Sequence, residues 1–427
     1  MNCGRENPPE LDLVHSKDEA QALAEYLRRA RQHASLSLAQ AAGTQLSATG
    51  LSRIERGLTR PSPRTLLHLN DRLGLDLRQA LHLWLASSPR TADRWAMTRC
   101  LRARDRLDLA EAIVSTLAPG EQKNAIGLHE QALILEARGE VDLAADLFRM
   151  ALEKAERTAN WNLRGEISLC LGRLCRLAGR PRSAVQHFAT AIRDLADQVS
   201  VVAARRQLAA AKLEWGALHW ALADYNLLLL RAGNGDEYYP DLLSGKAFAL
   251  NALGEPREAL DLNRIALGRY SLMNNHRRIA DTLNNIGACY KHLGAYPNGI
   301  AAGLESIELR SNDPLSIYTM VEIAELSLLA GDPAQADDHV CRARGLIARS
   351  SMHHEEALAI MVLEAIIHHD SLAQLLSRLT GATSTWAPND ERLILQFRRA
   401  LETAIGLNRG DIASNVLAHM ARWDLAE

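Results

Sequence analysis

The chain of 427 residues contains 71 Leu and 67 Ala, with only 4% aromatic and 23% charged residues. This composition favours helices packed on helices and excludes disorder as a description of the whole chain. The formal net charge of −2 excludes a uniformly basic nucleic-acid binder, although it permits a local basic patch.

The sequence predicts neither a membrane span nor an export signal. The longest wholly apolar run, residues 357–363, is too short to cross a bilayer, and residues 1–20 have no apolar core of signal-peptide length. The six cysteines do not form a disulfide framework, and no cluster of Cys and His has the spacing of a zinc site. We therefore expect a cytoplasmic protein with reduced thiols, no metal and no cofactor.

The first part of the chain contains a basic module. Residues 20–84 carry nine Arg against four acidic residues, although the whole chain has a formal charge of −2. A small basic module on an otherwise acidic chain suggests that one side of the module contacts nucleic acid.

Apolar periodicity and capping signals predict five short helices in this module. They cover residues 20–33, 36–42 and 48–56, and two more begin at residues 63 and 77. Ser47, Ser62 and Asp76 each place a side-chain oxygen at a helix start, where it accepts from free amides. Gly57 and Gly74 supply the left-handed residue that ends a helix. The module is therefore predicted to be a compact bundle.

The stretch LSLAQAAGTQLSATGLSRIERGLTRPSPRTLLHLNDRLGLDL, residues 36–77, resembles the helix-turn-helix of the Cro/XRE repressor family. The most specific part is LSRIERG followed by PS, TLL and LGL. This sequence departs from the family pattern in three ways. The segment between Leu36 and Ser52 is one residue shorter, Leu38 and Ala41 replace a Gln and a large apolar residue, and Gly50 lies inside the third helix, where it costs about 1 kcal/mol relative to Ala.

The resemblance implies that the third helix enters the major groove of DNA. It assigns base contacts to Ala48, Thr49, Ser52 and Arg53, phosphate contacts to Arg56 and Arg60, and both a cap and a phosphate contact to Ser47. Arg53 is suited to a bidentate contact with guanine. Arg28, Arg29 and Arg31 of the first helix are further candidates for phosphate contacts. The alternative is that Thr49, Ser52, Arg53 and Arg56 are ordinary solvated surface residues.

The rest of the chain is an internal repeat. Five glycines, at positions 139, 179, 254, 294 and 331, have a small residue seven before, five after and twelve after, and mostly a larger residue nine after. Small residues at these offsets let two antiparallel helices approach closely. The pattern resembles the tetratricopeptide repeat, which implies a right-handed superhelix of helical hairpins. Degenerate units are expected to turn near Asp105, Ala217, Asp370 and Gly410.

The sequence thus predicts an all-α protein in which a five-helix, lambda-repressor-like DNA-binding domain precedes a superhelix of tetratricopeptide repeats. The expected parts are a flexible arm at 1–19, the helix-turn-helix domain at 20–86, a linker with a degenerate first repeat at 87–125, and the repeat domain at 126–427.

The resemblance also implies a concave face, lined by the first helix of each repeat, that binds peptides or partner helices. Positions thirteen, ten and three before the aligning glycine face it, and they and their neighbours give the predicted effector-binding set: Arg173, Arg176, Asn251, Asp281, Asn284, Asn285, Lys291, Tyr318 and Glu322. An Asn amide both donates to and accepts from a peptide backbone. The alternative is that Asn284 and Asn285 only cap helices or bridge them through water.

A Cro-like module followed by such repeats resembles the peptide-responsive quorum-sensing regulators called the RRNPP group. The resemblance implies a homodimer on a double-stranded DNA operator, with a short signalling peptide in the repeat groove that changes the spacing of the two DNA-binding modules. An alternative is a DNA-binding scaffold whose repeats recruit a partner protein without peptide switching. The sequence has no glycine-rich phosphate loop and no nucleophile elbow, so no enzymatic activity is expected.

Overall fold

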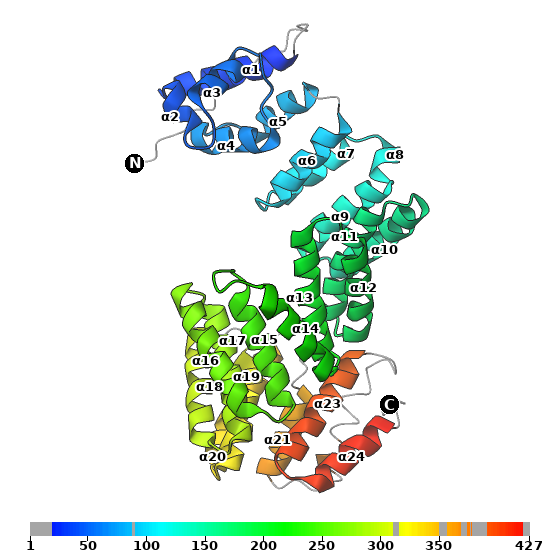
Figure 1. Ribbon diagram of the computed structural model, residues 1–427, viewed down its shortest axis with the longest axis vertical. Helices are drawn as coiled ribbons and strands as arrows, with labels where there is room; N and C mark the ends of the chain where they lie inside the picture. The colour runs from blue at the N-terminus through cyan, green and yellow to red at the C-terminus, as the bar shows by residue number, and fades with distance from the viewer. Residues whose placement is uncertain are drawn as a thin grey trace. The chain divides into compact units, whose positions relative to one another are not determined.

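The computed structural model describes residues 19–87, 90–310, 316–349, 357–368, 374–375, 377 and 391–421. Apart from Glu19, the predicted N-terminal arm lies outside them. Helices are the regular elements throughout the described residues, as predicted (Figure 1). The chain divides into two compact units, residues 1–167 and 168–427.

The first unit contains the predicted five-helix module and the helices that follow it. These helices are α1 (Glu19–His33), α2 (Leu38–Ala42), α3 (Ala48–Glu55), α4 (Pro63–Leu73), α5 (Leu77–Ala86), α6 (Thr91–Arg102), α7 (Leu107–Ser115), α8 (Pro119–Gln122), α9 (Ala125–Arg138), α10 (Val141–Arg157) and the start of α11 (Trp161–Leu177).

The predicted caps of the module are confirmed. The side chains of Ser47, Ser62 and Asp76 accept from backbone amides at the starts of α3, α4 and α5. Gly57 and Gly74 have positive φ angles of 71° and 62°. The predicted start of the second helix at residue 36 is two residues early, because Ser37 and Gln40 form a capping box that starts α2 at Leu38.

The hydrophobic core of the module continues into α6 and α7. Leu27, Leu51 and Leu66 belong to the same buried cluster as Trp95 of α6 and Ile113 of α7. Within the predicted linker and degenerate first repeat, α6 and α7 form a helical hairpin that turns at Asp105, as expected from the sequence. The helix-turn-helix module therefore shares its core with the first hairpin.

The second unit is a stack of helical hairpins. Its helices are the rest of α11, α12 (Pro181–Asp194), α13 (Gln198–Glu214), α14 (Leu218–Arg231), α15 (Tyr239–Ala252), α16 (Pro256–Leu272), α17 (His276–His292), α18 (Tyr296–Arg310), α19 (Ser316–Leu329), α20 (Pro333–Arg349), α21 (Ala357–Ile367), α23 (Glu391–Gly406) and α24 (Gly410–Ala421).

The glycines that align the repeats all lie at the turns of hairpins. Gly139, Gly179, Gly254, Gly294 and Gly331 have φ angles between 69° and 90°, a region that Gly occupies without strain. The degenerate unit predicted near Ala217 turns at the neighbouring Gly216, which has a φ of 83°. The last turn lies before Gly410, because Asn408 takes the left-handed conformation and Gly410 begins α24. The turn expected near Asp370 lies outside the described residues.

The small residues of the repeat pattern are buried where paired helices touch. Ala132, Ala144 and Ala151 of the hairpin α9–α10 have no exposed surface. Gly172 lies so close to Phe188 that a Cβ atom at this position would be 2.5 Å from the Phe188 ring. The small and large positions of the repeat are therefore complementary in volume.

Two further expectations concern cysteines and membranes. None of the five cysteines in the described part of the chain takes part in a disulfide bond there. None of the described helices is long and apolar enough to span a bilayer.

Candidate functional sites

Helix α3 has one buried face and one exposed face. Leu51, Ile54 and Glu55 are buried, whereas Thr49 and Arg53 are exposed on the other side. Arg56, the residue after the helix, is exposed as well, so positions 49, 53 and 56 form one stripe at helical spacing. Ser52 and Ala48, which complete the predicted base-reading set, are partly exposed.

The exposed face of α3 is positively charged, and the acidic residue of this helix is buried. Glu55 is the only acidic residue of α3, and it is 6% exposed. Its carboxylate accepts from two nitrogens of Arg31, at 2.6 Å and 2.8 Å, so its charge is neutralised inside the domain. This pairing also commits Arg31, a candidate phosphate contact, to the core side of α1. The exposed face of α3 therefore carries Arg53 and Arg56 with no exposed carboxylate of the same helix.

The start of α3 explains why Gly50 lies inside the helix. The Gly50 amide donates to the Ser47 hydroxyl at 3.0 Å and so completes the N-cap. A Cβ atom at position 50 would lie 3.1 Å from the same hydroxyl and 3.0 Å from the Leu46 side chain. Glycine at position 50 therefore leaves room for the Ser47 cap, and this offsets the cost of a glycine inside the helix. The sequence pattern did not indicate this role of Gly50.

Arg60 takes a different place from the one its sequence position suggests. Its guanidinium lies 3.9 Å from the centre of the Trp84 ring, and Nη1 lies 2.8 Å from Asp93 Oδ2 of α6. Nη2 also donates to the Trp84 carbonyl oxygen at 3.2 Å. The predicted phosphate contact of Arg60 thus competes with three interactions inside the unit.

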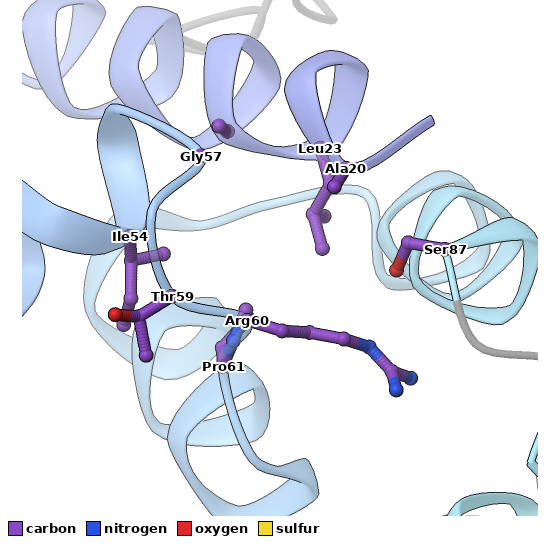
Figure 2. A pocket seen from close by; sticks show the side chains of 9 residues that line it. Ala20, Leu23, Ile54, Gly57, Thr59, Arg60, Pro61 and Ser87 are labelled. Carbon is purple, nitrogen blue, oxygen red and sulfur yellow. The ribbon is translucent and has the colours of Figure 1, made fainter. Parts of the chain in front are cut away.

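The loop that carries Arg60 packs tightly between α1 and α3. Figure 2 shows Gly57, Thr59 and Pro61 of this loop lining a small pocket together with Ile54 of α3 and Leu23 of α1. The cavity they line has a volume of about 10 Å³, which is room for one water molecule and no ligand. The loop therefore has a structural role in this module.

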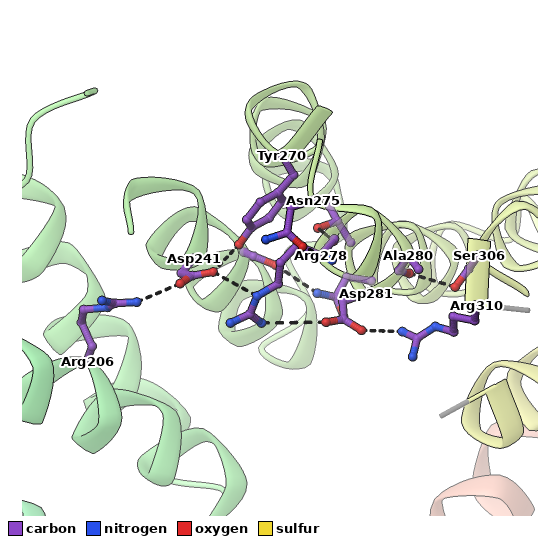
Figure 3. Close-up of polar contacts among 12 residues, drawn as sticks. Arg206, Asp241, Tyr270, Asn275, Arg278, Ala280, Asp281, Ser306 and Arg310 are labelled. Carbon is purple, nitrogen blue, oxygen red and sulfur yellow. Dashed lines mark hydrogen bonds and ion pairs between the residues drawn. The ribbon is translucent and has the colours of Figure 1, made fainter. Parts of the chain in front are cut away.

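In the second unit, the first helices of successive hairpins contact each other and are joined by polar side chains. Figure 3 shows one such network. Arg206 Nη2 of α13 lies 2.8 Å from Asp241 Oδ2 of α15. Arg278 of α17 lies 3.5 Å from Asp241 and 3.8 Å from Asp281, and Asp281 also pairs with Arg310 of α18. Asp281, a predicted effector residue, is thus held between two arginines.

Other predicted effector residues take part in similar contacts between first helices. Arg176 Nε of α11 donates to Glu214 Oε2 of α13 at 3.0 Å. Asn285 Nδ2 of α17 donates to the Ser244 hydroxyl of α15 at 3.2 Å. Arg173 has a different contact, since its Nη2 lies 3.4 Å from the Cys170 sulfur on the same helix. The contacts of Arg176 and Asn285 therefore stabilise the stack of hairpins.

Two predicted asparagines keep an acceptor without a partner. Asn284 of α17 is 7% exposed, and its Oδ1 has no hydrogen-bond partner among the described residues. Asn251 of α15 is partly exposed, and its Oδ1 is unpartnered as well. A buried amide oxygen without a partner costs free energy, so both positions are prepared to accept a hydrogen bond from a ligand or water.

The remaining predicted residues gather around a buried pair of carboxylates on α19. Lys291 of α17 pairs with Glu325, and Tyr318 donates to Glu322 Oε1 at 3.0 Å. Burial raises the pKa of Glu322. Burial acts in the same direction on Glu325, but the charges of Arg399 and Lys291 outweigh it and hold the pKa of Glu325 below its ordinary value.

Sequence reasoning missed the part of this cluster that comes from α23. Thr403 Oγ1 donates to Glu325 Oε1 at 2.7 Å, and Arg399 Nη2 lies 3.3 Å from the same oxygen. The two hydrogen-bonded residues are 78 positions apart in the chain. No local pattern indicates such a contact, because it depends on how far the stack curves.

Comparison with known proteins supports both parts of this description. Residues 22–83 match the family model of a helix-turn-helix domain. A Rap protein, solved in complex with Competence and Sporulation Factor, is similar to this chain with a TM-score of 0.59 and 12% identity, over 78% of this chain and 98% of Rap. This likeness shows a shared fold.

Two further solved structures are less similar. The apo form of the quorum sensor NprR from B. thuringiensis has a TM-score of 0.44 and 13% identity, over 85% of this chain and 96% of NprR. BtubC from P. vanneervenii has a TM-score of 0.41 and 21% identity, over 50% of this chain and 93% of BtubC. No curated protein matches the chain by sequence similarity.

Proposed function

We propose that this protein is a sequence-specific DNA-binding transcription regulator, acting as a homodimer, whose repeat helices bind a short peptide that modulates DNA binding. The observation that carries the DNA-binding part is the exposed stripe of Thr49, Arg53 and Arg56 on a helix whose acidic residue is buried and paired. Arg53 extends from the last turn of α3 and is suited to a guanine edge, whereas Arg56, the residue after the helix, is suited to a phosphate.

The proposed set of DNA-contacting residues is smaller than the set predicted from the sequence. Ser47, Ala48, Thr49, Ser52, Arg53 and Arg56 remain in it. Arg60 is left out, because its guanidinium is already stacked on Trp84 and paired with Asp93. A phosphate contact by Arg60 would cost these interactions.

The effector part rests on the first helices of the second unit. Asn251 and Asn284 offer unpartnered amide oxygens. Extended peptides supply backbone N–H groups that fit such acceptors. The Rap protein, which shares the fold, was solved with a bound factor, and this supports a ligand-binding role for the repeats.

The experiment that tests the proposal has two steps. DNA fragments bound by the full-length protein are first selected from a random pool, and the affinity for the best fragment is measured for the protein and for Arg53→Ala and Arg56→Ala variants. Arg78→Ala is the matched control, because Arg78 is an exposed arginine of the same module outside α3. We expect both α3 variants to bind more weakly and the control to bind as the unchanged protein does.

The second step adds peptides to the complex. A mixture of short peptides from the culture medium of the source cells is titrated into the DNA complex, and a change in DNA affinity supports peptide switching. Unchanged affinity at every peptide concentration would leave constitutive DNA binding with the repeats as a scaffold. Equal affinity of the α3 variants and the control would refute the DNA-binding role of α3.

A further inference from the structure

Helix α23 has two chemically distinct faces. Phe397, Ala400 and Ala404 are fully buried and form a hydrophobic cluster with side chains of α21 and α24. Arg399 and Thr403 lie on the other side, at a spacing of four residues, and contact α19. The helix is thus fixed to the end of the stack by apolar packing, and Arg399 and Thr403 add polar contacts to an earlier repeat.

The polar face of α23 covers residues predicted to bind an effector. The Arg399 guanidinium lies 5.2 Å from the centre of the Tyr318 ring and 3.3 Å from Glu325 Oε1. A Cβ atom added at Gly406 would lie 3.7 Å from Lys291 Nζ, so the end of α23 lies beside the lysine of α17. These contacts reach the first helices of two earlier hairpins.

The charges at this contact do not balance without α23. Glu322 and Glu325 are 7% and 0% exposed, and Lys291 of α17 pairs with Glu325. Removing Arg399 and Thr403 would remove a positive charge and a hydrogen bond from Glu325 and would leave Lys291 as its ion-pair partner. A buried carboxylate without a counter-charge is strongly unfavourable. A ligand that takes the place of α23 must therefore bring a cation.

We propose that α23 competes with the effector peptide for the first-helix face around Glu325, and that the peptide that displaces α23 presents an Arg or Lys side chain to Glu325 and Glu322. The proposal rests on the proposed function, since it concerns the same first-helix face. Guanidinium in the place of Arg399 restores the lost charge, and its planar donors match a carboxylate. An acidic peptide would add negative charge beside the Glu325 carboxylate and is excluded from this position.

The test measures amide hydrogen exchange in α23 of the full-length protein without DNA. Two variants remove the polar contacts: Thr403→Val alone, and Thr403→Val combined with Arg399→Gln. The matched control is Arg398→Gln, because Arg398 is the neighbouring arginine, is half exposed and pairs with Glu402 of its own helix. We expect exchange over residues 397–406 to rise about tenfold in the double variant and to stay unchanged in the control.

The same measurement is repeated with two hexapeptide probes, Gly-Gly-Arg-Arg-Gly-Gly and Gly-Gly-Glu-Glu-Gly-Gly. The arginine probe is expected to accelerate exchange in α23 of the unchanged protein and to bind the double variant about tenfold more tightly. The glutamate probe is expected to do neither. Equal exchange in the double variant and the control, or equal binding of the two probes, would overturn the proposal.

A variant that loosens the whole unit would also be recognised. If exchange in α15 rises together with that in α23, the single Thr403→Val variant decides, because it keeps every charge. An increase confined to α23 supports the competitor role, and no increase refutes it. DNA affinity does not enter this test, so failure of the proposed regulator function and failure of the α23 proposal give different results.

Discussion

Replacement of Arg60 by Ala separates a structural role from a DNA contact. The change removes the stacking on Trp84 at 3.9 Å, the ion pair with Asp93 at 2.8 Å and the hydrogen bond to the Trp84 carbonyl. Stacking on Trp contributes about 0.5–1 kcal/mol, and a partly exposed ion pair up to about 1 kcal/mol. With the hydrogen bond, the loss in free energy of unfolding is about 2 kcal/mol.

Thermal unfolding followed by tryptophan fluorescence measures this loss. For a unit of this size, about 2 kcal/mol lowers the melting temperature by about 4–8 °C. Arg56→Ala is the matched control, because Arg56 is exposed and its Nε donates to the Ser52 carbonyl of the helix it follows. The melting temperature of this variant should stay within about 1 °C of that of the unchanged protein. A normal melting temperature for Arg60→Ala together with weaker DNA binding would refute the reasoning and restore Arg60 as a phosphate contact.

Four further predictions follow from the same contacts. Arg53→Ala should cost about 1–3 kcal/mol of DNA affinity and relax the preference at one base position, and a uniform loss across sequences would make Arg53 a phosphate contact. Arg31 and Arg60 are held inside the first unit, so we expect a dimer to engage only about two to four phosphates. The slope of log affinity against log salt concentration should then be about −2 to −4. A slope steeper than about −5 would contradict the smaller set of phosphate contacts. Burial raises the pKa of Glu322, so the folded state keeps the proton of this carboxyl to higher pH than the unfolded state does, and the free energy of unfolding falls as pH rises above the ordinary pKa of 4.5. The melting temperature of Glu322→Gln minus that of the unchanged protein should therefore grow between about pH 4 and pH 7. A difference that stays constant with pH would contradict this prediction. Gly172→Ala should destabilise the protein by about 1–3 kcal/mol, because a Cβ atom at this position would lie 2.5 Å from the Phe188 ring. Gly268→Ala should stabilise it by up to about 1 kcal/mol, because a Cβ atom at position 268 would meet no other atom within 4 Å. Equal effects of the two changes on the melting temperature would refute the packing argument.

Local signals in the sequence predicted the fold well. A helix cap is formed by residues within four positions of each other, so Ser47, Ser62 and Asp76 could be identified without knowledge of tertiary structure. The turn glycines and their small neighbours recur at fixed offsets, and the repetition made the register of the hairpins visible. Both kinds of signal depend on residues that are close in the chain.

The candidate sites were less predictable, because the side chains that define them are satisfied by distant partners. Arg60 has the sequence position of a DNA-contacting arginine, yet its guanidinium pairs with Asp93, which lies 33 residues later in the chain. Lys291 and Glu322 have the positions of groove residues, yet α23 covers the cluster in which they lie through Arg399 and Thr403. A polar residue on a predicted face is available to a ligand only if no later helix supplies its counter-charge. The curvature of the stack decides this, and it is the sum of small rotations between hairpins that no single repeat encodes.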